Sequence, residues 1–76
     1  MDEGAAKEYL LRNDERFQQL AAQHRQFEEK LSALTQRPFL TTDEQIEETV
    51  IKKKKLALKD QMHMLILQAQ AQDPVH

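Results

Sequence analysis

The stretch Thr35-Gln36-Arg37-Pro38-Phe39-Leu40-Thr41-Thr42 decides the fold, because it divides the chain into two long segments that both have helical patterns. Proline disfavours helical geometry in the residue before it, so a helix that arrives from the N-terminal side is expected to end by about Gln36. The chain therefore bends at Pro38, and a second helix has to start beyond it.

Start signals for that second helix follow at once. Thr41 with Glu44, or Thr42 with Gln45, fits a capping box, in which a hydroxyl and a carboxylate or amide satisfy the first free backbone amides of a helix. Pro74 stops any helix near the other end. We expect a single domain over 1–76, with one helix over about 5–36, a loop at 37–41, a second helix over about 42–71 and a frayed tail at 72–76.

An apolar stripe follows the first segment, with members spaced alternately three and four residues apart: Phe17, Leu20, His24, Phe27, Leu31 and Leu34. This is the a/d repeat of a coiled-coil seam. The stripe stays in phase back to Leu10 and Ala6. A break at Asn13-Asp14 is the alternative to one continuous helix, since Asn and Asp side chains compete locally for backbone hydrogen bonds.

The second segment has a matching row and further apolar residues outside it. The row consists of Ile51, Leu58, Met62, Leu65 and Ala69, with Lys55 as its one charged member. Ile46, Val50, Ala57 and Met64 lie on a neighbouring strip, and Leu56 and Leu67 point in a third direction. One partner helix cannot cover so wide an apolar arc. The fold class predicted is therefore all-α, an antiparallel two-helix hairpin that resembles a coiled coil and assembles into a four-helix or larger bundle.

Composition excludes several classes of protein. With 76 residues and a net charge of −2, the chain is one small domain with no global attraction to nucleic acid or anionic membrane. One glycine and two prolines do not suit a turn-rich β fold, and the absence of cysteine removes disulfides and thiolate metal sites. The acidic start Met1-Asp2-Glu3-Gly4 has no apolar core of a signal peptide, and the run Met64–Leu67 is far too short to span a membrane. We expect a cytoplasmic protein that makes no membrane contact.

The histidines are weak candidates for chemistry. His24 lies on the apolar stripe, where an imidazole could act as a pH switch or ligand, or could fix the register between helices by bonding to a carbonyl or carboxylate of the facing helix. His24, His63 and His76 lack partners at the helical spacing of a metal site. There is no glycine-rich phosphate loop and no nucleophile set, so we expect no metal, no cofactor and no enzyme activity.

The run Lys52–Lys55, with Lys59 after it, is the main charge cluster. Such a run could contact phosphates. Four consecutive residues spread around the whole circumference of a helix, however, and Glu47, Glu48 and Asp60 flank them, so a solvated face is the simpler interpretation.

The pattern Asn13-x-x-Arg16-Phe17-x-x-Leu20-x-x-x-His24-x-x-Phe27-Glu28-x-x-Leu31, followed by Ile51-Lys52-Lys53-Lys54-Lys55-Leu56-Ala57-Leu58-Lys59-Asp60-Gln61-Met62, resembles the YdcH-like family of small bacterial proteins. The resemblance covers about Asn13 to Leu65, and two residues depart from it: Phe27 stands where Leu is usual, and Asp14 stands where Pro often follows Asn. It implies a bacterial, cytoplasmic helical hairpin with no assigned activity and no catalytic residues.

Three functions remain open. The first is a non-enzymatic module for protein interaction or self-assembly, the second is association with nucleic acid through the lysine cluster, and the third is a sensor built on His24. The expected interaction surface consists of Lys52, Lys53, Lys55, Leu56, Lys59, Asp60, Met64 and Leu67. The expected seam consists of Phe17, Leu20, His24, Phe27, Leu31, Leu34, Ile51, Leu58, Met62 and Leu65.

Overall fold

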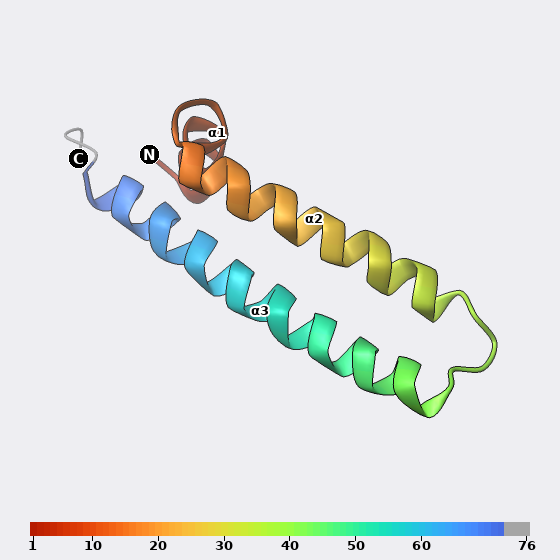
Figure 1. Ribbon diagram of the computed structural model, residues 1–76. Coiled ribbons are helices and arrows are strands. Elements are labelled where there is room, and N and C mark those ends of the chain that lie inside the picture. Colours follow the sequence, from red (N-terminus) through yellow and green to blue (C-terminus); the bar gives the residue numbers. More distant parts are fainter. Residues whose placement is uncertain (73–76) are drawn as a thin grey trace.

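The computed structural model describes residues 1–72, and within them the chain is all-α. Its three helices are α1 (Glu3–Asn13), α2 (Glu15–Thr35) and α3 (Thr42–Ala71). Helices α2 and α3 lie side by side and run in opposite directions, and α1 folds across the end of this pair, opposite the loop (Figure 1). The molecule is a rod of 52 × 18 × 17 Å. The predicted all-α class is confirmed.

The prediction of one continuous helix over about 5–36 is wrong, because the chain turns at Asp14. The backbone of Asp14 is extended, with φ −117° and ψ 110°, and its N–H donates to the Leu10 carbonyl at 2.9 Å, which ends α1. Its side chain accepts a hydrogen bond from the Phe17 amide at 2.8 Å, which caps the start of α2. The alternative of a break at Asn13-Asp14 is therefore the correct one, and the two-helix hairpin becomes a three-helix arrangement.

The bend at Pro38 is placed as expected. Helix α2 ends at Thr35, and the first of the two capping boxes is the one that forms: the Thr41 hydroxyl accepts from the Glu44 amide at 3.1 Å, while the Glu44 carboxylate accepts from the Thr41 amide at 3.0 Å. Arg37 adds an ion pair to Glu44 across the loop. Helix α3 ends at Ala71, as predicted; of the expected tail, 73–76 lies outside the described residues.

The core lies at the end of the rod where the three helices meet. Ala6 and Leu10 of α1, Phe17 of α2, and Ile66 and Ala69 of α3 form one buried cluster, and Phe17 and Ala6 expose none of their surface. Met62 and Leu65 pack against this cluster while they remain partly exposed. The side-chain amide of Gln70 also donates to the Met1 carbonyl at 3.4 Å, which adds a contact between the two ends of the described chain.

The predicted seam between α2 and α3 forms, but it is buried unevenly. Phe17, Leu20, Leu34, Ile51 and Leu58 are buried, whereas His24, Phe27, Leu31, Met62 and Leu65 are half-buried. Ile66 is buried although the sequence pattern did not place it in the seam. It is covered because it belongs to the cluster that α1 completes, so the buried arc of α3 is wider here than a single partner helix would make it.

Candidate functional site

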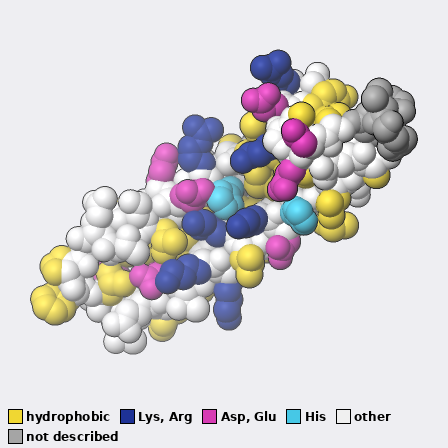
Figure 2. Space-filling model, turned by 180° about the vertical axis from the view of Figure 1, so that it is seen from behind, with side chains coloured by type: hydrophobic (Ala, Val, Ile, Leu, Met, Phe, Trp, Pro, Cys, Tyr) yellow, Lys and Arg dark blue, Asp and Glu magenta, His cyan; other side chains and the backbone are white. Residues whose placement is uncertain are grey.

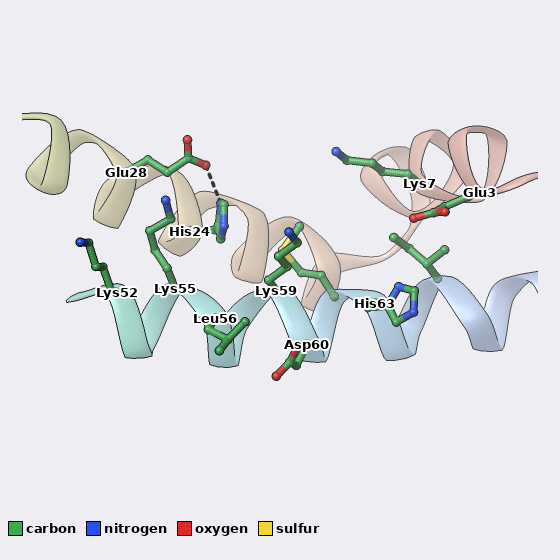
Figure 3. Close-up of a pocket in the computed structure, with 12 residues that line it drawn as sticks. Glu3, Lys7, His24, Glu28, Lys52, Lys55, Leu56, Lys59, Asp60 and His63 are labelled. Atoms are coloured by element: carbon green, nitrogen blue, oxygen red, sulfur yellow. Dashed lines mark ion pairs between the residues drawn. The ribbon is translucent and has the colours of Figure 1, made fainter. Parts of the chain in front are cut away.

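A groove with a volume of about 870 Å³ runs between α2 and α3 and reaches α1 (Figure 3). Met62 and Ile66 supply apolar surface to it, and the other lining side chains are mostly charged or polar. Those from α3 are Lys52, Lys55, Leu56, Lys59, Asp60 and His63; α2 contributes His24 and Glu28, and α1 contributes Glu3 and Lys7. The space-filling view shows basic, acidic and histidine side chains gathered in the middle of one face (Figure 2).

Lysines from the basic cluster line this groove as a row. Lys52, Lys55, Lys59 and His63 follow one another at intervals of three, four and four residues, which puts them on one side of α3. Lys55 and Lys59 extend from α3 toward α2 (Figure 3). Two lysines of the consecutive run, Lys52 and Lys55, therefore share one side of α3 with Lys59.

The other two lysines of the run lie elsewhere. The Lys54 ammonium lies 5.8 Å from the centroid of the Phe27 ring, and the Lys30 ammonium lies 5.9 Å from the same centroid. Both distances suit cation–π attraction. Lys53 is exposed and does not line the groove. Neighbouring lysines thus serve different surfaces, as their spread around the helix predicted.

His24 pairs with its own helix. Its Nδ1 lies 2.7 Å from Oε1 of Glu28, one turn further along α2, and its side chain is 23 % exposed. The expectation of a partner on the facing helix is wrong. This pair orients the imidazole at the wall of the groove. Lys52 is held in the same way, because its Nζ lies 3.3 Å from Oε1 of Glu48.

The groove carries more basic than acidic side chains. Its four lysines, Lys7 included, face only three carboxylates, those of Glu3, Glu28 and Asp60. Residues 1–72 hold no group of three or more His, Cys, Asp or Glu side chains that could bind a metal ion. The groove is lined by no Ser or Thr hydroxyl, so it offers no hydroxyl or thiol nucleophile.

A second surface lies on the outside of α3. We call it the outer row, and it consists of Ile46, Val50, Lys53, Ala57, Asp60, Met64 and Leu67, at alternate intervals of four and three residues. Each member is exposed: Ile46 by 59 %, Met64 by 55 %, Leu67 by 45 % and Val50 by 42 %. Leu67 extends this row, and Leu56, about three turns earlier on nearly the same side of α3, lines the groove.

Helix α3 therefore has two apolar sides. The inner side, which includes Ile51, Leu58 and Ala69, packs against the rest of the chain. The outer row begins at Ile46 and repeats with the same spacing on a different side of the helix. A helix at the surface of a monomer has one apolar stripe, so the second stripe is the feature that requires an explanation.

The class defined by this geometry is a small all-α protein built on an antiparallel helix pair. Within the described residues, no helix has the length and apolar character needed to cross a bilayer. Residues 17–66 match the family DUF465, described as a protein of unknown function, and because the match covers most of the chain, the chain belongs to that family. No curated protein and no solved structure matches the chain. The matched region spans most of α2 and most of α3 and leaves α1 outside it.

Proposed function

We propose that this chain is a non-enzymatic protein-interaction module that associates with itself through the outer side of α3. The observation that carries the proposal is the outer row, in which four large aliphatic side chains are each more than two-fifths exposed along one side of one helix. Full burial of such a side chain is worth about 1.5–3 kcal/mol. An interface that covers the row would recover part of that free energy.

Sedimentation of the purified chain, compared with the Met64→Glu variant, tests self-association. We expect the chain to form a dimer or a larger bundle, and we expect Met64→Glu to raise the dissociation constant at least about tenfold, because a charge at this position would have to be buried. Gln26→Glu is the matched control, since Gln26 is exposed on α2 and the substitution adds the same charge away from the outer row. A chain that stays monomeric at every concentration reached would refute the proposal.

The groove supports a second candidate, association with nucleic acid. Here the carrying observation is that Lys52, Lys55 and Lys59 line a single groove together with Lys7 of α1. A row of cations along a helix can neutralise successive phosphates, and such binding weakens steeply as salt rises.

Binding to a DNA duplex between about 50 and 200 mM salt tests this candidate. For each lysine that contacts a phosphate, a Lys→Gln variant is expected to flatten the slope of log K against log salt by about 0.9. Lys55→Gln and Lys59→Gln should have this effect, whereas Lys53→Gln, outside the groove, should not. Absence of binding at the lowest salt concentration would end this candidate.

The setting that we propose is bacterial and cytoplasmic. It rests on the resemblance to YdcH-like proteins over about Asn13 to Leu65, a region that overlaps almost completely with the family match at 17–66. No cofactor is part of the proposal, and the partner proposed is a second copy of the chain.

A further inference from the structure

We infer that two copies of this chain pair along their outer rows with the two α3 helices antiparallel, about a two-fold axis beside Ala57. This inference rests on the proposed self-association through the outer side of α3, and it adds the orientation and register of the two copies. The order of charged and apolar side chains within the outer row favours this pairing.

The outer row has nearly the same chemistry when it is followed in either direction from Ala57. Ala57 is its middle member, and Lys53 and Asp60 are the next members on the two sides. Beyond them come Val50 on one side and Met64 on the other, and the row ends with Ile46 and Leu67: Ile46, Val50, Lys53, Ala57, Asp60, Met64, Leu67. The row is therefore symmetric in size and polarity, but opposite in charge.

An antiparallel pair of outer rows uses this symmetry. Lys53 of each copy then lies opposite Asp60 of the other, so two ion pairs flank the axis. The apolar members at each end meet apolar members of the second copy, with Val50 opposite Met64. Ala57 meets Ala57 at the centre, where small side chains let two helices approach closely.

A parallel pair would bring like charges together. Lys53 would lie against Lys53 of the second copy, and Asp60 against Asp60, in the middle of an interface that excludes water. Juxtaposed like charges disfavour such a complex strongly. The two charged members of the outer row therefore select the antiparallel orientation.

Within the described part of the chain, Lys53 and Asp60 have no internal partner for their charges. Among residues 1–72, the ion pairs formed by charged side chains involve neither of them. Both side chains are exposed, and Asp60 points away from α2 (Figure 3). Each can therefore pair with the second copy without the loss of an internal partner.

Single-cysteine variants test the orientation, and the chain offers a clean background because it contains no cysteine. Under mild oxidation, Ala57→Cys is expected to give a disulfide-linked dimer, since the two sulfurs lie beside the axis. Ile46→Cys is expected to give none, because the two positions would be about 33 Å apart along antiparallel helices, and a disulfide needs Cα atoms within about 7 Å. A parallel pair would crosslink at both positions.

Charge reversal provides a second, independent measurement on folded protein. Asp60→Lys is expected to weaken self-association at least about tenfold, because each Lys53 then faces a lysine. The double variant Lys53→Asp/Asp60→Lys is expected to restore it, since the pairs form again with their signs exchanged. Circular dichroism of each variant confirms that the helices are intact.

The outcomes separate the inference from the function on which it rests. A monomeric wild-type chain overturns both. Self-association together with crosslinking through Ile46→Cys overturns the antiparallel orientation and leaves the proposed function standing. If the chain self-associates, but Ala57→Cys gives no crosslinked dimer and the charge variants leave the dissociation constant unchanged, the choice of surface is overturned.

Discussion

Replacement of Phe17 by alanine is expected to lower the free energy of unfolding by about 3–5 kcal/mol. Phe17 exposes none of its surface and is the largest fully buried side chain among the described residues. It belongs to the cluster in which all three helices meet, so its loss leaves a cavity bordered by each of them. The total stability of a domain of this size is about 4–11 kcal/mol, so the substitution removes a large share of it.

Urea unfolding followed by circular dichroism measures this effect. Phe39→Ala is the matched control, because Phe39 lies in the loop with 86 % of its surface exposed and undergoes the same chemical change. We expect this control to stay within about 0.5 kcal/mol of the wild type. All chains must be compared at one protein concentration, since self-association adds to apparent stability. Equal losses for the two variants would contradict the assigned core.

Leu58→Ala is expected to cost about 2–5 kcal/mol. Leu58 lies on the inner side of α3 and is only 8 % exposed. Its neighbour Leu56, two residues earlier on the same helix, is 59 % exposed. The two leucines therefore have the same chemistry and helix propensity, and they differ in burial.

The comparison of Leu58→Ala with Leu56→Ala, again by urea unfolding, isolates the contribution of the seam. We expect Leu56→Ala to change stability by no more than about 0.5 kcal/mol. A cost at Leu56 equal to that at Leu58 would mean that α3 packs with a different side toward α2.

Local signals in the sequence were enough to predict the bend and the packed sides of the helices. Pro38 and the pair Thr41 and Glu44 act within a few residues, so their effect on the backbone is visible without the rest of the chain. The stripe from Phe17 to Leu34 likewise identifies the buried side of α2, because helical periodicity depends only on spacing.

Features that depend on α1 could not be predicted in the same way. Ala6 and Leu10 keep the phase of the stripe across Asp14, so periodicity gives no sign of the turn there. Ile66 is buried because α1 packs against it, and the spacing of residues within α3 gives no information about that contact.

The candidate site also has some features that the local sequence predicts and others that depend on how the helices pack. The spacing of Lys52, Lys55 and Lys59 was present in the sequence, although the run of four lysines obscured it. That Lys7 and His24 lie along the same groove follows only from the way in which three helices meet. The outer row, in contrast, is a property of α3 alone, and the spacing in the sequence already placed four of its members on one strip: Ile46, Val50, Ala57 and Met64.

The groove and the outer row lie on different sides of α3. Asp60 is the one residue that both surfaces share. An interface along the outer row therefore leaves the lysines of the groove accessible. The same assembly can consequently present two basic grooves, one from each copy.

The composition of the buried cluster also has a consequence for biosynthesis. Ile66 and Ala69 are translated some sixty residues after Ala6 and Leu10, with which they share a cluster. Until those residues of α3 are synthesised, α1 lacks part of the surface that buries its apolar side chains. The burial of Ala6 and Leu10 consequently has to follow synthesis of the turns of α3 that carry Ile66 and Ala69.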